Sequence, residues 1–307
     1  MTPLHSFIQA MLDKAAALPP LHTFTPEQIR ATDTARYAAV PRIAVGHVED
    51  RLIPGPLGDI KIRIYRPDLA GGHPVIAFFH GSGFVICSID THDGLCRQLC
   101  MRAEAVVVSV DYALAPERKF PAAPDDCLAA ASWAADHARE FGGDPARLAL
   151  AGDSAGGNLA IVTALRIRDA GGPAIKAQLL MYPVTDYHTP GTPSYVERAT
   201  GFGLSADAMK YFFAHYLNDA SEGAHPHVSP LRAPSLAGLP PAYVMTAEYD
   251  PLRDEGERFA ARLSAAGVET TLVRYGDVNH GFMSWVGLID SSDRALDAAC
   301  AWLKRIV

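Results

Sequence analysis

The serine in the Gly-x-Ser-x-Gly sequence of residues 152–156 is a strong candidate for covalent chemistry. An apolar run, 148–151, precedes Ser154, and a segment compatible with a helix follows it. This order predicts a strand, a tight turn and a helix, with the serine at the apex of the turn. Both flanking glycines are needed because a side chain there would collide with the adjacent strand or helix. A plain loop is the alternative for the motif alone, but the predicted strand and helix favour a nucleophile.

A nucleophilic serine requires a base within hydrogen-bond reach, and the base requires an acid that orients it. Open α/β sheets bind ligands at the carboxyl ends of their strands, so polar residues just after predicted strands are the candidates. Asp250 follows one such strand and His280 follows the next. The chain order Ser154, Asp250, His280 is the order expected with a nucleophile elbow. Glu248 and Asp153 remain rivals for the acid.

Backbone amides that could stabilise a developing oxyanion come from two places. The segment His80-Gly81-Ser82-Gly83 follows a predicted strand and carries few Cβ atoms, so its amides can approach a substrate. Ala155 lies at the expected helix N-terminus, where unpaired N–H groups favour negative charge. We expect the two to form an oxyanion hole, although the first segment taken alone could be a simple turn.

The elements that must position these residues alternate between short apolar strands and helices. Continuous apolar runs are typical of parallel strands covered on both faces, and strand–helix alternation predicts a doubly wound sheet. An alternating segment, 60–65, together with 48–53, predicts an antiparallel start to that sheet. The further predicted strands are 75–79, 105–110, 148–151, 177–181, 242–246 and 270–274. The predicted helices are 92–103, 125–140, 155–170, 252–266 and 292–305.

Two segments fall outside this alternation and predict a helical cap. Residues 187–233 contain no good strand and a helix-like stretch rich in Phe and Tyr, and insertions of this length are usually functional. Residues 1–45 are helical by pattern, with Thr25 as the cap of a helix that starts at Pro26. We therefore predict a catalytic domain of residues 46–186 and 234–307 and a cap of residues 1–45 and 187–233.

The composition excludes several classes of protein. A net charge of −7 and a pI near 5.9 argue against a nucleic-acid-binding surface. The 307 residues contain no apolar run long enough for a membrane span, and the N-terminus lacks the pattern of a signal peptide. Five cysteines without a Cys-x-x-Cys pair indicate buried, reduced thiols and a cytoplasmic protein. No metal-ligand constellation is present, so we expect neither a metal nor a cofactor.

Four blocks together resemble the hormone-sensitive-lipase family of α/β hydrolases, the bacterial family IV esterases. They are HGSGF at 80–84, DYALAPE at 111–117, GDSAGG at 152–157, and DPLRD at 250–254 with HGF at 280–282. The resemblance implies the α/β-hydrolase fold with a helical cap. It also implies a Ser154–His280–Asp250 triad and oxyanion donors from the amides of Ser82, Gly83 and Ala155.

The chain departs from the family pattern at two positions. Ser82 stands where the family usually has glycine, and a serine prefers negative φ and adds a hydroxyl near the oxyanion. Ala113 stands where arginine is common, within a block that we interpret as structural.

We therefore predict a carboxylic-ester hydrolase that works through an acyl-enzyme and prefers short or compact acyl esters, because large rings narrow a capped pocket. A small-molecule receptor on the same fold, or an amidase or deacetylase, is the alternative. The strand at 270–274 could pair with its copy in a homodimer. The residues expected to line the substrate pocket are Phe84, Phe202, Tyr211, Phe212 and Trp285.

Overall fold

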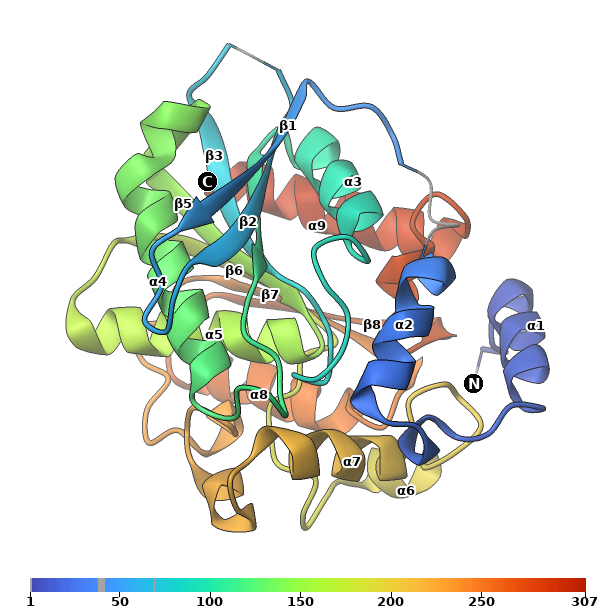
Figure 1. Cartoon of the computed structure of the whole chain (residues 1–307). Coiled ribbons are helices and arrows are strands. Elements are labelled where there is room, and N and C mark those ends of the chain that lie inside the picture. The colour runs from blue at the N-terminus through green and yellow to red at the C-terminus, as the bar shows by residue number, and fades with distance from the viewer. Residues whose placement is uncertain (1, 38–41, 69) are drawn as a thin grey trace.

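An eight-stranded β-sheet runs through the computed structural model, which describes residues 2–37, 42–68 and 70–307 (Figure 1). Its order is β1-β2-β4-β3-β5-β6-β7-β8; β2 pairs antiparallel with β1 and β4, and all other neighbours are parallel. The predicted mostly parallel sheet with an antiparallel start is confirmed. The strands are β1 (His47–Ile53), β2 (Ile60–Arg66), β3 (His73–Phe79), β4 (Val106–Asp111), β5 (Gly143–Asp153), β6 (Ile175–Met181), β7 (Ala242–Tyr249) and β8 (Thr270–Asn279).

Burial along the strands follows their hydrophobic patterns. All eight residues of β7 are buried, as expected of a parallel strand covered on both faces. In β2 the isoleucines are buried while Lys61 and Arg63 are partly exposed, so one face of that strand is wet. The β8 strand forms an edge of the sheet, as predicted, and it runs five residues beyond the predicted end at Arg274. Pairing of two copies along this edge stays a prediction.

Helices cover both faces of the sheet, which confirms the doubly wound architecture. One hydrophobic core lies between the sheet and helices α3 and α9, and a second lies between the sheet and α4, α5 and α8. The α4 helix starts three residues earlier than predicted and ends in a 3₁₀ turn at Ala138–Phe141. These helices are α3 (Asp93–Ala103), α4 (Ala122–His137), α5 (Ala155–Ala170), α8 (Arg253–Ala265) and α9 (Asp290–Ile306).

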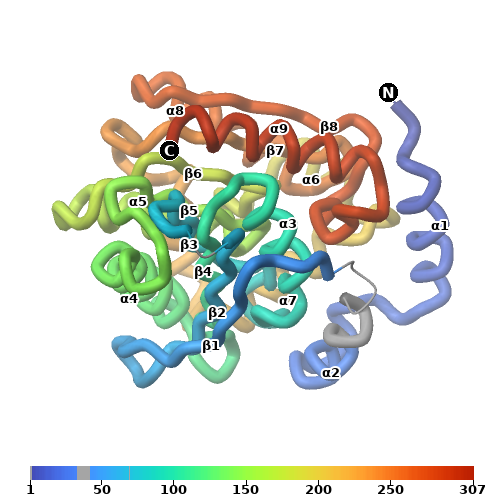
Figure 2. Tube along the Cα trace, turned by 90° about the horizontal axis from the view of Figure 1, so that it is seen from above, coloured from blue at the N-terminus to red at the C-terminus, as the bar shows by residue number. Residues whose placement is uncertain are grey.

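The segments predicted to form a cap are helical. Residues 187–233 contain no strand and hold α6 (Pro193–Glu197) and α7 (Ala206–Tyr216). The N-terminal helices are α1 (Ser6–Ala15) and α2 (Pro26–Tyr37), and both lie at one side of the sheet (Figures 1 and 2). The α2 helix begins at Pro26 as predicted, with the Thr25 hydroxyl accepting from Gln28 N. Residues 1 and 38–41 of the predicted cap lie outside the described residues, and its domain boundaries stay a prediction.

The two cap segments contact each other and the sheet edge. The Tyr211 hydroxyl of α7 donates to the backbone oxygen of Phe24, which lies just before α2. The Asn279 side chain, at the end of β8, donates to the backbone oxygen of Phe202. The cap loop before α7 is thus tied to the residue that precedes His280.

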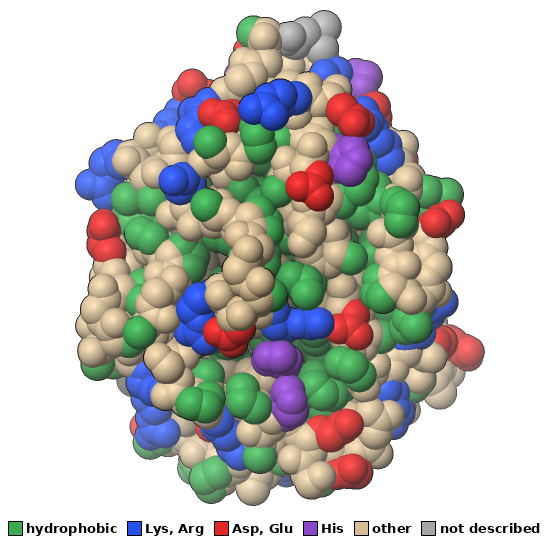
Figure 3. Space-filling model, turned by 90° about the vertical axis from the view of Figure 1, so that its left-hand side faces the viewer, with side chains coloured by type: hydrophobic (Ala, Val, Ile, Leu, Met, Phe, Trp, Pro, Cys, Tyr) green, Lys and Arg blue, Asp and Glu red, His purple; other side chains and the backbone are tan. Residues whose placement is uncertain are grey.

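Surface charge, helix hydrophobicity and the state of the cysteines were each predicted from the composition. Acidic and basic side chains are interspersed on the face drawn in Figure 3. Within the described part of the chain, no helix is both long and apolar enough to cross a bilayer. All five cysteines are buried and free of disulfide bonds, in agreement with the prediction of buried thiols.

Candidate active site

Ser154 occupies a strained turn between β5 and α5. Its backbone has φ 54° and ψ −119°, a conformation that residues with a Cβ rarely adopt and that commonly marks a functional site. The predicted steric need for the flanking glycines is confirmed. A Cβ on Gly156 would lie 1.9 Å from the oxygen of Phe79, and one on Gly152 would lie 2.3 Å from the backbone of Gly156. The turn therefore holds Ser154 out at the carboxyl end of β5.

The side chains of Asp250, His280 and Ser154 form a continuous series of hydrogen bonds. His280 Nε2 is 2.8 Å from Ser154 Oγ, and His280 Nδ1 is 2.7 Å from Asp250 Oδ2. Asp250 is fully buried, and its other oxygen accepts from Leu252 N at 2.8 Å. Because the Asp250 carboxylate only accepts, it places the imidazole proton on Nδ1 and leaves the Nε2 lone pair toward Ser154. This arrangement can remove a proton from a serine hydroxyl.

The tyrosine that follows β6 packs against this histidine. The Tyr182 ring meets the His280 ring edge-on, with the ring centroids 4.9 Å apart. Tyr182 itself has a positive φ of 37°, which is rare for a bulky residue, and its amide donates to Met245 O at 2.7 Å. Tyr182 was not predicted as part of the site, because its place beside His280 depends on how the ends of β6 and β8 come together across β7.

The first rival acid, Glu248, lies in a different environment. Its carboxylate lies 2.9–3.2 Å from the side chains of three arginines, so both of its oxygens are paired with arginines, whereas His280 pairs with Asp250. Burial acts to raise the pKa of Glu248, but the arginines hold that pKa below its usual value. Glu248 therefore connects the cap to the sheet edge through charge. The three arginines are Arg198, Arg253 and Arg274.

The second rival acid, Asp153, points away from His280. Its Oδ1 accepts from Gly81 N at 2.7 Å and lies 3.3 Å from Nε2 of His92, the residue at the N-cap of α3. Burial acts to raise the pKa of Asp153, but the charge of His92 and the Gly81 amide hold it below its usual value. The carboxylate beside the nucleophile thus holds the segment at 80–84, which we call the oxyanion loop.

The oxyanion loop and the start of α5 present free amides. Among the described residues, the amides of Ser82, Gly83 and Ala155 donate to no protein acceptor, whereas the Gly81 amide is taken by Asp153. The positive φ values in the loop fall on Gly83 (54°) and Phe84 (66°) and not on Ser82. A serine at position 82 therefore fits the backbone without the strain that its replacement of glycine suggested.

The Ser82 hydroxyl bonds within the protein. It lies 2.6 Å from the hydroxyl of Tyr112 and accepts from Phe84 N at 2.8 Å. Tyr112 also donates to the backbone oxygen of His80. The block at 111–117, interpreted from sequence as structural only, thus supplies a residue that holds the oxyanion loop. The contact of Tyr112 with the loop was not predicted, because its partners Ser82 and His80 come from a different strand end.

Two of the expected pocket residues lie at the oxyanion loop. A Cβ on Gly83 would lie 2.4 Å from the Phe212 ring, so that ring packs directly on the glycine. Phe84 is 1% exposed and stacks face to face on Tyr216, with ring centroids 3.9 Å apart. The Phe84 ring is therefore part of the core that supports the loop.

The other three expected pocket residues make contacts that join the cap to its surroundings. The Trp285 ring packs edge-on against Phe7 of α1, with centroids 5.4 Å apart. The Phe202 ring lies 5.1 Å from the ring of Tyr249, which directly precedes Asp250. Tyr211 bonds to the N-terminal segment, as described above. Their role in binding substrate stays a prediction.

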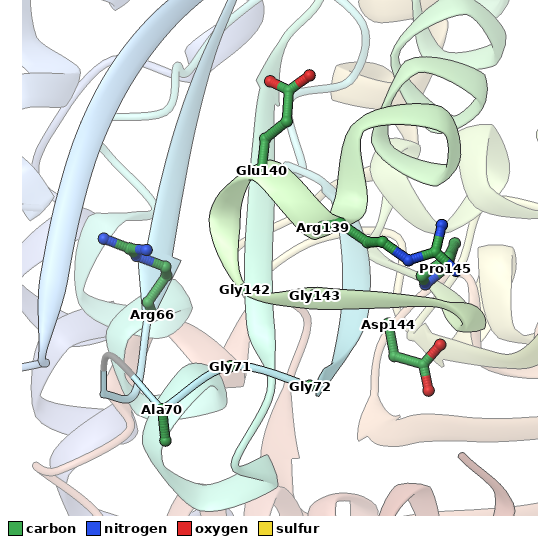
Figure 4. Close-up of a pocket in the computed structure, with 10 residues that line it drawn as sticks. All are labelled: Arg66, Ala70, Gly71, Gly72, Arg139, Glu140, Gly142, Gly143, Asp144 and Pro145. Atoms are coloured by element: carbon green, nitrogen blue, oxygen red, sulfur yellow. The ribbon is translucent and has the colours of Figure 1, made fainter.

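A surface hollow lies at the opposite end of the strands and does not belong to this site. It is lined by the turn before β3 and the start of β5, with Arg66 and Arg139 on its walls (Figure 4). In Figure 4 the two guanidinium groups point away from each other. Among the described residues, no group of three His, Cys, Asp or Glu side chains could hold a metal ion.

Comparisons with known proteins agree with this geometry. A family model described as "alpha/beta hydrolase fold" matches residues 76–284. The chain is 42% identical over 282 residues to Esterase LipI of Mycobacterium tuberculosis, covering 91% of this chain and 87% of LipI. It is 42% identical over 253 residues to Carboxylesterase NlhH of the same organism, covering 81% and 79%. A solved hyperthermophilic esterase from the archaeon Pyrobaculum calidifontis has a TM-score of 0.94 at 40% identity and covers 99% of both chains.

The chain belongs to the α/β-hydrolase fold family. Within that family the predicted resemblance to the hormone-sensitive-lipase-like esterases is confirmed, and the chain is a carboxylesterase of this group.

Proposed function

We propose that this carboxylesterase hydrolyses short-chain or compact acyl esters, with Ser154 as nucleophile, His280 as general base and acid, and Asp250 as the residue that orients His280. The observation that carries the proposal is the hydrogen-bonded series Asp250–His280–Ser154, with separations of 2.7 and 2.8 Å. It ends at a serine held on a strained turn at the carboxyl end of the sheet.

The proposed reaction has two steps. His280 Nε2 takes the proton of Ser154 as Oγ attacks the ester carbonyl, and the resulting oxyanion accepts hydrogen bonds from the amides of Ser82, Gly83 and Ala155. His280 then gives that proton to the leaving alcohol, which leaves the acyl group on Ser154. A water molecule, deprotonated by His280, then attacks the acyl carbon. The bond between that carbon and Ser154 Oγ breaks, His280 returns the proton to Oγ, and the acid is released.

Preference for compact esters is supported by the enclosure of the site. Ser154 is 8% exposed and the His280 side chain 12%, so little open surface surrounds the reacting atoms. The Phe212 ring on Gly83 takes up space beside the proposed oxyanion donors. We expect these contacts to limit the room for a long acyl chain.

The test is a series of p-nitrophenyl esters of rising acyl length, assayed with the wild-type chain and with Ser154→Ala. We expect rates to peak at short acyl chains, and we expect the variant to lose turnover while its thermal melting curve is retained. Retained turnover in Ser154→Ala would exclude Ser154 as the nucleophile. Faster cleavage of emulsified long-chain triglyceride than of a soluble butyrate ester would overturn the size preference. Absence of any ester rate in folded protein would direct the search to amides or to ligand binding.

A further inference from the structure

Two buried hydroxyl groups bridge the two ends of the oxyanion loop. Tyr112 Oη is 2.6 Å from the backbone oxygen of His80 and 2.6 Å from Ser82 Oγ. Ser82 Oγ in turn lies 2.8 Å from the backbone nitrogen of Phe84. Both side chains are nearly inaccessible to solvent, with Tyr112 2% exposed and Ser82 5%.

Each hydroxyl group has one proton to donate, so the donor and the acceptor of every hydrogen bond in this bridge can be assigned. A carbonyl oxygen can only accept, so the one proton of Tyr112 must go to His80 O. The Ser82 hydroxyl must therefore donate to Tyr112 Oη, and Ser82 Oγ accepts from the Phe84 amide. Burial raises the pKa of Tyr112 far above its usual value, so the phenol keeps this proton throughout the working pH range. The order is Phe84 N–H to Ser82, Ser82 to Tyr112, and Tyr112 to His80.

The bridge is anchored to rigid structure. Tyr112 directly follows Asp111, the last residue of β4, and its ring stacks on the His80 ring with centroids 4.4 Å apart. The loop has a second attachment, because Gly81 N donates to the carboxylate of Asp153. The bond from Gly81 N precedes the amides of Ser82 and Gly83, the proposed oxyanion donors, and the bond from Phe84 N follows them.

We propose that Ser82 and Tyr112 are positioning residues whose hydrogen-bond chain fixes the two loop amides where the oxyanion forms. The inference rests on the proposed function and extends it to the residue that replaces the family's usual glycine. A chain with glycine at position 82 has no Oγ, so the Phe84 amide and the Tyr112 oxygen would both lose this partner. Oxyanion stabilisation depends on donor placement, so a looser loop would slow the chemical step while leaving ground-state substrate binding nearly unchanged.

The test compares Ser82→Ala, Tyr112→Phe and the double variant with wild type, using a short p-nitrophenyl ester and an arylboronic acid as a tetrahedral mimic. Tyr112→Phe keeps the ring that stacks on His80 and removes only the hydroxyl. Tyr216→Phe is the matched control, because Tyr216 is also buried beside the loop but its hydroxyl has no hydrogen-bond partner in the described part of the chain.

We expect each single variant to lose roughly 10- to 100-fold in kcat with KM within about threefold, because misplacing reacting groups by about 1 Å costs roughly 100-fold. The boronic acid should bind more weakly by the same factor as kcat/KM falls. The double variant should lose no more than the worse single one, since either change breaks the same chain. Tyr216→Phe should match wild type in all three measurements.

Several results would overturn the inference while the proposed function stands. They are wild-type kcat in both single variants, losses that multiply in the double variant, or a loss confined to KM. Since the loss is read as a split between kcat and KM in protein with a normal melting curve, simple destabilisation does not imitate it. The proposed function fails separately, if Ser154→Ala keeps its activity.

Discussion

Replacing Asp250 with asparagine tests the geometry of the triad by exchanging one carboxylate oxygen for an NH2 group. The structure determines which way the new amide must face. One carboxylate oxygen of Asp250 accepts from Leu252 N at 2.8 Å, so the amide oxygen of the introduced asparagine is held at that position. The amide NH2 then faces His280 Nδ1, where the carboxylate oxygen lay at 2.7 Å. The opposite orientation would set two donors against each other in a fully buried site, at a cost of about 1–3 kcal/mol.

With an NH2 group at Nδ1, the imidazole must accept there and carry its proton on Nε2. That proton points at Ser154 Oγ, so His280 can no longer act as the base, and the positive charge that develops on it has no counter-ion. For an asparagine in place of the triad aspartate the loss in kcat is about 10⁴-fold, which equals about 5 kcal/mol of barrier. We expect a loss of this order from Asp250→Asn, with KM changed by less than about threefold.

The assay is steady-state hydrolysis of a p-nitrophenyl ester by wild type, Asp250→Asn and Glu248→Gln, each checked by its melting curve. Glu248 is the control because it is a carboxylate two residues away whose partners are arginines. Its variant should lose stability with a kcat within about threefold of wild type. A loss below tenfold in Asp250→Asn would refute the tautomer argument. An equal loss of kcat in Glu248→Gln would favour Glu248, instead of Asp250, as the acid that orients His280.

Two further predictions concern stability. Gly156→Ala should lower the free energy of unfolding by more than about 3 kcal/mol or prevent folding, because its Cβ would lie 1.9 Å from Phe79 O. Gly267→Ala, at φ +80° in open space, should cost only about 1 kcal/mol; equal costs in urea denaturation would contradict the steric argument. Burial raises the pKa of Glu255 from 4.5 to about 8, although its carboxylate accepts from Thr185 N. Between these pH values the folded chain holds a proton that the unfolded chain has lost, so stability falls as pH rises, by at most about 1.4 kcal/mol per unit. Glu255→Gln should flatten that fall in urea titrations at several pH values, and an unchanged slope would exclude Glu255 as its source.

Much of the fold was predictable because local patterns and the buried sheet agree. Continuous apolar runs in the central strands and the alternation in β2 reflect how many faces of each strand are covered, and the structure has both patterns. The element ends were predicted less well: β5 starts five residues before its predicted start, and β8 continues to Asn279, since edge strands are half exposed. That extension places His280 immediately after the strand.

The sequence by itself determined the chemical groups of the candidate site and their order. Ser154, Asp250 and His280 each follow a strand, and the carboxyl ends of parallel strands meet at one edge of a sheet. The requirement for glycine at position 156 was also predictable from the sequence, because a tight strand–turn–helix leaves no room for a Cβ atom. These features depend on short-range geometry and on one general rule of sheet topology.

Only the tertiary structure decided how those groups are held. The proposed choice of Asp250 over Glu248 and Asp153 depended on contacts that folding brings together, among them Arg198 with Glu248 and the Gly81 amide with Asp153. The proposed role of Ser82 likewise depends on Tyr112, which directly follows β4. Side-chain hydrogen bonds between strand ends produce no periodic pattern in a sequence, because the tertiary packing determines which side chains meet.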